Sequence, residues 1–186
     1  MRIDVSDLRV SYGSYNALDG VSFSFSSQHM MAIVGPNGGG KSTLFKALMG
    51  VIRPSSGSIK YEGLSPDHMA YLPQSQDMDR SFPISVLEAV SSGLHKKKGW
   101  HQRYTPSDFE EIYDLLDRLG LFSLKDRPLE HLSGGQFQRV LFARLLLQSA
   151  RCILLDEPFV GIDVKTIDIL IESLLKLHQQ GTMVLT

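Results

Sequence analysis

The sequence predicts an α/β fold with a mainly parallel β-sheet and a helical insert in its middle. Short apolar runs alternate with helical patterns in the first and last parts of the 186 residues, which is typical of parallel strands joined by helices. At about residues 84–149 the apolar residues recur at helical spacing. We expect a single domain over 1–186, because this length suits one hydrophobic core and is too short for two of full size.

Seven short segments have the pattern of β-strands. The two nearest the N-terminus alternate apolar and polar residues, as half-buried strands do. Met30–Val34 is instead a continuous apolar run that ends in glycines, which predicts a strand buried on both faces. The full set is 3–10, 21–25, Met30–Val34, Ser58–Tyr61, Met69–Leu72, Cys152–Leu155 and Met183–Leu185.

Three helices have marked ends. Thr105 and Pro106 are of the types preferred at the start of a helix, and a glycine follows the end of each of the three. The expected helices run from near Lys41 to Gly50, from Pro106 to just before Gly120, and over Ile167–Gln180 before Gly181.

Composition and charge exclude several classes of protein. The formal net charge of −1 gives no general attraction to nucleic acid or to an anionic membrane. No window approaches 18 uninterrupted apolar residues, and an acid at Asp4 argues against a signal peptide, so we expect a chain that does not span a membrane. The single cysteine, Cys152, lies in an apolar run and is expected to be a buried, reduced thiol, which suits the cytoplasm.

A phosphate-binding loop follows the apolar run at Met30–Val34. The segment Gly35, Pro36, Asn37, Gly38, Gly39, Gly40, Lys41, Ser42 matches the pattern G-x-x-x-x-G-K-[ST] in full, between an expected strand and an expected helix. Glycines allow successive backbone N–H groups to face phosphate oxygens, and the start of the helix adds a partial positive charge. Lys41 is expected to reach the β and γ phosphates, Ser42 to hold Mg²⁺, and Thr43 to add a phosphate contact.

A second motif begins the helix that follows residue 132. Ser133 and Gln136 form the S-x-x-Q pattern of a capping box. Gly134 and Gly135 between them are poor helix formers, so helix stability alone would not select them, and they suit close approach to an anion. The segment Leu132–Gln136 is identical to the signature motif of the ABC ATPases, and the chain resembles that family.

An acidic pair ends the apolar run Cys152–Leu155. The segment Ile153–Pro158 resembles the Walker B motif of this family. The resemblance implies that Asp156 binds Mg²⁺ through water and that Glu157 polarises the water that attacks the γ phosphate.

Three further positions match the family. Tyr12 resembles the aromatic residue that stacks on adenine. Gln74 resembles the glutamine that contacts Mg²⁺ and the attacking water and couples to the membrane subunits. Asp163 resembles the aspartate of the D-loop. The resemblance covers the whole chain, with its motifs in the family's order.

The resemblance implies a P-loop NTPase fold with antiparallel strands near the N-terminus and a helical subdomain that carries the signature motif. It also implies a motor subunit that binds ATP with Mg²⁺ and hydrolyses it. In this family the signature residues of one copy cover the γ phosphate held by another. We therefore expect a head-to-tail homodimer that drives transmembrane permease subunits, and indirectly a solute-binding protein, from the inner face of the membrane.

The substrate is inferred from resemblance alone. The stretches 74–93 and 157–163 look like those of the subfamily that imports zinc, manganese or iron. Importers of iron–siderophore complexes or cobalamin share parts of the same pattern and remain an alternative.

The last residue, Thr186, lies inside the strand that should present the family's switch histidine. No other histidine fits, since His178 precedes that strand. We expect from this that the chain is truncated, and that it binds ATP but hydrolyses it slowly or not at all.

A soluble ABC ATPase that acts on DNA or ribosomes is a rival interpretation. The basic run 95–103, which contains Trp100, could bind a nucleic-acid backbone, although an acidic segment follows it and a solvated loop is the favoured interpretation. The six histidines show no paired ligand spacing, so the Mg²⁺ carried with ATP is the metal expected at the site.

Overall fold

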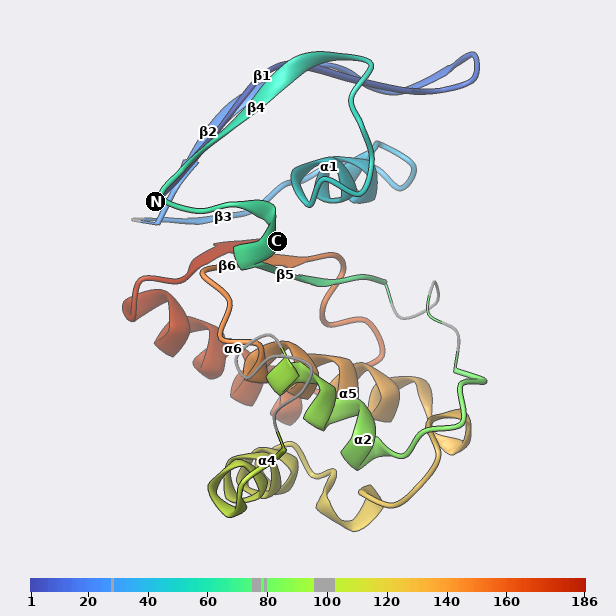
Figure 1. The fold of residues 1–186 in the computed structure, drawn as a ribbon. Coiled ribbons are helices and arrows are strands. Elements are labelled where there is room, and N and C mark those ends of the chain that lie inside the picture. Colours follow the sequence, from blue (N-terminus) through green and yellow to red (C-terminus); the bar gives the residue numbers. More distant parts are fainter. Residues whose placement is uncertain (28, 75–77, 79, 96–102) are drawn as a thin grey trace. The chain divides into compact units, whose positions relative to one another are not determined.

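The computed structural model describes residues 1–27, 29–74, 78, 80–95 and 103–186. Figure 1 shows their secondary structure, coloured along the chain. These residues form two compact units. The core unit comprises Met1–Tyr71, Ala150–Asp156 and Lys176–Thr186, and the helical unit comprises Leu72–Ser149 and Glu157–Leu175.

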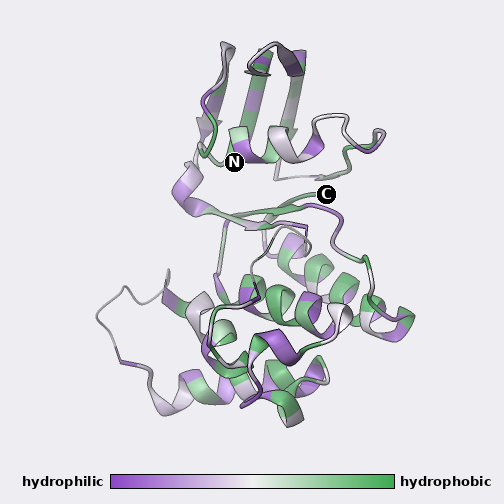
Figure 2. Ribbon diagram, turned by 90° about the vertical axis from the view of Figure 1, so that its right-hand side faces the viewer, coloured by the Kyte–Doolittle hydropathy of each residue, from purple (hydrophilic) through white to green (hydrophobic). Residues whose placement is uncertain are grey.

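The core unit contains a three-stranded antiparallel sheet near the N-terminus. Its strands are β1 (Arg2–Tyr12), β2 (Tyr15–Ser26) and β4 (Ser56–Glu62), in the order β2-β1-β4. Hydrophilic and hydrophobic residues alternate along these strands (Figure 2). Ile3 and Val5 are buried, whereas Asp4 between them lies on the other face, as the period of two requires. The expected N-terminal strands are thus confirmed.

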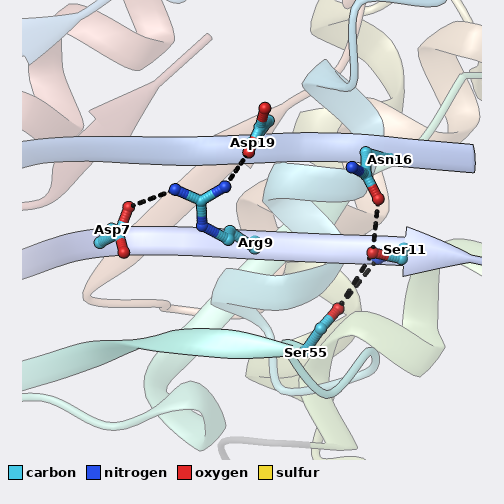
Figure 3. Close-up of polar contacts among 6 residues, drawn as sticks. All are labelled: Asp7, Arg9, Ser11, Asn16, Asp19 and Ser55. Carbon is cyan, nitrogen blue, oxygen red and sulfur yellow. Dashed lines mark hydrogen bonds and ion pairs between the residues drawn. The ribbon is translucent and has the colours of Figure 1, made fainter.

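Polar side chains cover the outer face of this sheet. Arg9 lies between two carboxylates, forming an ion pair with Asp7 at 3.2 Å and a shorter one with Asp19 on the neighbouring strand (Figure 3). All three side chains are largely exposed, so water screens the pairs and each contributes little to stability. The cluster marks the solvent side of the sheet and leaves the opposite side for the core.

A four-stranded sheet completes the core unit. Its order is β3-β7-β6-β5, from β3 (Met30–Met31), β7 (Met183–Leu185), β6 (Cys152–Leu155) and β5 (Met69–Leu72). β7 pairs in parallel with β3 and with β6. The expected bounds of β5, β6 and β7 are confirmed.

The expectation for Met30–Val34 is wrong in both length and burial. The strand has two residues, and Met30 and Val34 are 40% and 93% exposed. β3 lies at the edge of the described sheet, where it pairs with β7 alone. After Ile33, whose N–H bonds to the Thr186 carbonyl at 2.6 Å, the backbone leaves the sheet for the glycine-rich loop. Apolar composition alone does not reveal that a strand stops there.

α1 (Lys41–Leu48) joins the two sheets into one core. Leu44, Phe45, Ala47 and Leu48 are buried in a cluster that also contains side chains of β1, β2, β5, β6 and β7. Burial of each large apolar side chain in this cluster stabilises the folded state by about 1.5–3 kcal/mol. The helix ends where expected, since Gly50 adopts a φ of 70° that other residues rarely reach.

The helical unit holds α2 (Val86–Ser91), α4 (Pro106–Arg118), α5 (Gly134–Leu147) and most of α6 (Val164–Gln179). α4 starts at Pro106 with Thr105 as its N-cap, as the sequence predicts. None of the helices in the described part of the chain is long and apolar enough to cross a membrane. Short 3₁₀ turns lie at Pro66–His68 (η1) in the core unit and at Ser92–Leu94 (η3), Phe122–Leu124 (η4) and Leu129–His131 (η5) in the helical unit.

α6 begins three residues before its expected start at Ile167. The reason is a cap, because the backbone N–H and hydroxyl of Thr166 donate to the Asp163 carboxylate at 3.0 and 2.8 Å. These bonds satisfy donors that the first turn of a helix leaves free. The end of the helix agrees with the prediction, and Gly181 follows it with a φ of 95°.

Cys152 supports a prediction about pH. Its burial in β6 raises the pKa of the thiol to about 12, from an ordinary value of 9.0. As the pH rises, the thiol therefore loses its proton at a lower pH in the unfolded chain than in the folded one. The buried neutral thiol stabilises the fold fully below pH 9, and this stabilisation is lost as the pH rises towards 12. We expect the free energy of unfolding to fall by up to about 1.4 kcal/mol per pH unit more in the wild type than in Cys152→Val over that range. Urea unfolding of both proteins at pH 7, 9 and 10.5 measures this; a constant difference between them would contradict it.

Candidate nucleotide-binding site

At the end of the glycine-rich loop the backbone passes so close to β2 that only glycine fits. Gly40 caps α1 with a φ of 86°. A Cβ atom at this position would lie 2.3 Å from the carbonyl oxygen of Ala17 in β2, so no side chain fits. Gly38 also has a positive φ, 77°. The conformation of the loop therefore accounts for Gly38 and Gly40 independently of any ligand.

Lys41 folds back over this loop. Its ammonium donates to the carbonyl oxygens of Gly35 and Pro36, both at 2.9 Å. The N–H of Gly39 also bonds to the Pro36 carbonyl, at 3.0 Å, which makes a tight turn beneath the ammonium. A lysine has three N–H donors. The Lys41 ammonium is thus held at the glycine-rich loop by two of its N–H groups, and the third can donate to an anion.

The first turn of α1 adds to the positive character of the loop. Ser42 and Thr43 lie in this turn and are half-buried. The turn contains no acidic residue. Free N–H groups at the start of a helix and its partial positive charge attract phosphate, and a carboxylate there would compete with it. The local chemistry therefore suits a phosphorylated ligand.

The β1–β2 hairpin brings two tyrosines to the loop's side of the core unit. Tyr12 and Tyr15 are directly opposite in the register and are 50% and 59% exposed. The Tyr15 hydroxyl donates to the Gly38 carbonyl at 3.2 Å, which ties the hairpin to the glycine-rich loop. Tyr12 is available to stack on a base, as its resemblance implies. Tyr15 was not predicted, and its only signal is its place across the turn from Tyr12.

The hairpin end is fixed by a small polar network. The Ser11 hydroxyl donates to the Asn16 side-chain oxygen at 2.9 Å, and the Ser11 N–H donates to the Ser55 hydroxyl at 3.1 Å (Figure 3). Ser11 precedes Tyr12, so the network restrains the backbone that carries the tyrosine.

Asp156 is a buried carboxylate at the end of β6. Its side chain accepts a hydrogen bond from the Tyr71 hydroxyl at 3.1 Å, and the residue is 2% exposed. No ion pair in the described part of the chain includes it. A buried charge without a cation is costly. The carboxylate, together with the Ser42 hydroxyl of the same unit, provides the oxygen ligands that Mg²⁺ prefers, so these residues fit that ion.

The signature segment lies in the helical unit and begins α5. Ser133 is the N-cap: the Gln136 N–H donates to its hydroxyl at 3.3 Å, and its own N–H donates to the Gln136 side chain at 2.9 Å. The expected capping box is confirmed. Ser133 and Gly134 are exposed, and among the described residues nothing beyond the neighbouring residues and the backbone of the same helix lies within 4 Å of a Cβ atom built on Gly134. This side of the helix start is open to a ligand or a partner.

The two glycines of this motif serve different purposes. A Cβ atom on Gly135 would lie 2.3 Å from the carbonyl oxygen of Gly161. The backbone after β6 thus packs directly on the start of α5. The motif predicts that both glycines suit the approach of an anion; for Gly135 the structure gives a packing reason instead, and of the two it is Gly134 that faces open space.

These glycines give a matched pair of substitutions. We expect Gly135→Ala to lower the free energy of unfolding by about 1–3 kcal/mol, because the new methyl group overlaps the Gly161 backbone. Gly134→Ala adds a methyl group to open space and is expected to leave stability unchanged or to raise it by up to about 1 kcal/mol. Urea unfolding of the two variants tests this, and equal stabilities would refute the distinction.

The remaining predicted residues also belong to the helical unit. Gln74 follows β5 and is half-buried, and Glu157 is exposed with a φ of 50°. Asp163 caps α6, and its hydrogen bonds from the Thr166 side chain and backbone lower the pKa of its carboxyl group. The core unit therefore holds the P-loop, Tyr12 and Asp156, whereas the helical unit holds the signature motif with Gln74, Glu157 and Asp163.

One buried residue with a clear role carries no sequence motif. Gln138 of α5 is 1% exposed and donates from its side-chain nitrogen to the Pro158 carbonyl at 3.0 Å. Nearby, the rings of Phe142 and Phe159 stack with their centroids 6.4 Å apart. These contacts fix the segment that contains Glu157 and Asp163 on the signature helix.

Comparison with known proteins agrees with these motifs. The family model for the ABC transporter matches residues 18–160. A probable ABC transporter ATP-binding protein of Cyanophora paradoxa is 40% identical over 179 residues, which are 94% of this chain and 73% of that protein. The manganese transport system ATP-binding protein MntA of Synechocystis sp. is 37% identical, over 98% of this chain and 73% of that protein. The chelated iron transport system membrane protein YfeB of Yersinia pestis is 38% identical, over 97% of this chain and 64% of that protein.

Solved structures show the same relation. A putative metal-chelate type ABC transporter in an inward-facing conformation is 31% identical with a TM-score of 0.75, covering 98% of this chain and 71% of that one. An ATP-binding subunit of an ABC transporter is 25% identical with a TM-score of 0.84, covering 100% of this chain and 78% of that one. The family model covers most of the chain, and several relatives exceed 30% identity over more than two thirds of their length. The chain therefore belongs to the ABC transporter family, as one of its ATP-binding proteins.

Proposed function

We propose that this chain binds Mg²⁺-ATP and hydrolyses it to drive the import of a divalent metal ion, such as manganese or zinc, through membrane permease subunits. The observation that carries nucleotide binding is the ammonium of Lys41 held over the glycine-rich loop at the start of α1. Family membership supports hydrolysis and transport. The names of the manganese and iron transport relatives support the choice of a metal.

The described residues have distinct proposed roles in binding and hydrolysis. Lys41 and the backbone N–H groups of the loop neutralise the charge of the β and γ phosphates, and the ring of Tyr12 stacks on the adenine ring. Asp156 and Ser42 would hold Mg²⁺, and the family resemblance gives Gln74 the role of a further contact to the ion. The ion would supply positive charge to the phosphates during transfer of the γ-phosphoryl group. Glu157 accepts a proton from the attacking water. Little covalent chemistry is required of the protein, because positioning and charge neutralisation provide most of the catalysis.

A second copy of the chain would complete the site. The chain has one P-loop and one signature motif. The exposed hydroxyl of Ser133 and the open space at Gly134 leave the start of α5 free to approach a phosphate. In the proposed dimer, Ser133, Gly134 and Gln136 of one copy cover the ATP held by the other, with Asp163 near the contact. Closure would pull on the permease at the inner face of the membrane, and a solute-binding protein would deliver the ion to the permease from outside.

Metal uptake by cells tests the transport proposal. Cells that lack the chain should lose uptake of one divalent metal in a panel of radioactive manganese, zinc and iron, and the wild-type gene should restore it whereas Lys41→Ala should not. Loss of siderophore or cobalamin uptake alone would favour the alternative importers. Unchanged uptake of every compound would contradict a role in transport and favour a soluble ABC ATPase. The basic run that suggested nucleic-acid binding lies largely in 96–102, outside the described residues.

A further inference from the structure

Tyr71 connects the two parts of the proposed magnesium site within the core unit. It lies in β5, the neighbour of β6, and its hydroxyl donates to Oδ2 of Asp156 at 3.1 Å. On its other side its ring lies 6.1 Å from that of Phe45, centroid to centroid. Phe45 is a buried residue of α1, three positions after Ser42. One side chain therefore touches both the buried acid and the helix that begins at the P-loop.

The hydroxyl of Tyr71 restrains a group that would otherwise rotate. The terminal torsion of an aspartate is broad and roughly two-fold, so a carboxylate without a partner samples several orientations. The bond from Tyr71 occupies Oδ2 of Asp156 and leaves Oδ1 with its lone pairs for another partner. No cation in the described part of the chain pairs with this carboxylate. The free oxygen is thus oriented before any ion binds.

We propose that Tyr71 is a positioning residue for Mg²⁺-ATP: its hydroxyl orients the Asp156 carboxylate, and its ring sets that carboxylate against α1. The inference rests on the proposed role of Asp156 as a magnesium ligand. Hydrogen-bond partners of metal ligands typically change metal affinity by about 10- to 100-fold when they are removed. No motif identifies Tyr71, because the contact joins residues 85 positions apart in the chain.

The test separates the metal-dependent part of nucleotide affinity from the rest. Calorimetry measures the Kd of a non-hydrolysable ATP analogue in Mg²⁺ and in EDTA. The ratio of the Kd in EDTA to the Kd in Mg²⁺ is the gain in affinity due to the ion. Tyr71→Phe keeps the ring against Phe45 and removes only the hydroxyl. We expect this ratio to fall about 10-fold in Tyr71→Phe while the Kd in EDTA stays the same.

Tyr61→Phe is the matched control. Tyr61 is a half-buried tyrosine of the same unit, and its hydroxyl donates to the Leu48 carbonyl at 2.8 Å, at the far end of α1. We expect this variant to keep the wild-type ratio. In an Asp156→Asn background, Tyr71→Phe should cause little further change, because the two residues act through one contact.

Each outcome is decisive. A wild-type ratio in Tyr71→Phe would overturn the inference and leave the proposed function intact. Equal weakening in Mg²⁺ and in EDTA would also overturn it, since that result indicates a general structural role. Failure of the wild-type chain to bind the analogue under either condition would instead refute the proposed function itself.

Discussion

Replacement of Lys41 by alanine is expected to weaken Mg²⁺-ATP binding by about 100-fold. The ammonium already sits over the glycine-rich loop, 2.9 Å from two carbonyl oxygens, and phosphate oxygens are stronger partners for it than neutral carbonyls. Hydrogen bonds to charged groups contribute about 1.5–3 kcal/mol each, and 2.7 kcal/mol corresponds to 100-fold in Kd. Calorimetric titration of the chain with ATP in the presence of Mg²⁺ measures the change.

Lys46→Ala is the control for this substitution. Lys46 lies in the last turn of the same helix, away from the loop. The variant loses the same charge from the chain, so a general electrostatic effect would appear in both. We expect Lys46→Ala to bind like the wild type; equal affinity of Lys41→Ala and the wild type would contradict the proposed site.

The second large effect is expected at Glu157. Glu157→Gln should lower the rate of ATP hydrolysis, which is already expected to be slow in the wild-type chain, by about 100- to 10,000-fold, since an amide cannot accept the proton of the attacking water. The substitution keeps the size of the side chain, so the affinity for Mg²⁺-ATP should remain within about two-fold of the wild type. A single-turnover assay with radiolabelled ATP gives the rate, and calorimetry gives the affinity.

The backbone at Glu157 supports a chemical role for its side chain. Its φ of 50° lies in the left-handed region, where a residue other than glycine is strained by about 1 kcal/mol or more. Strain of this kind persists where the surrounding structure fixes the residue, and it is frequent at active sites; Asp7 and Ser149, which have no role in the proposed site, also have a positive φ. Glu130→Gln is the matched control, because Glu130 is an exposed glutamate of the same unit just before the signature segment. Hydrolysis unaffected by Glu157→Gln would remove Glu157 from the mechanism.

The sequence predicts those parts of the site whose cause is local. The capping box of Ser133 and Gln136 and the helix that starts at Lys41 depend on residues within four positions of each other. The bounds of β6 and β7 follow from short apolar runs between a turn and a helix end. For these elements the expected and observed structures agree.

Other features depend on contacts between distant segments, which no local pattern contains. The partner of Gly135 is Gly161, and the partner of Gly40 is Ala17, so the reason for each glycine appears only in the folded chain. Tyr15 and Gln138 likewise gain their roles from backbone carbonyls 23 and 20 positions away. The apolar character of Val34 predicts that it is buried, but it is exposed, because the strand before it lies at the edge of the sheet and ends early.

The mass of the Glu157→Gln chain in solution tests the central claim most directly. This variant should retain ATP, so light scattering during gel filtration should show twice the mass of one chain in Mg²⁺-ATP and a single-chain mass without nucleotide. Lys41→Ala should remain a single chain under both conditions. A single-chain mass with ATP bound to every chain would contradict the shared site, and absence of ATP binding would contradict the whole account.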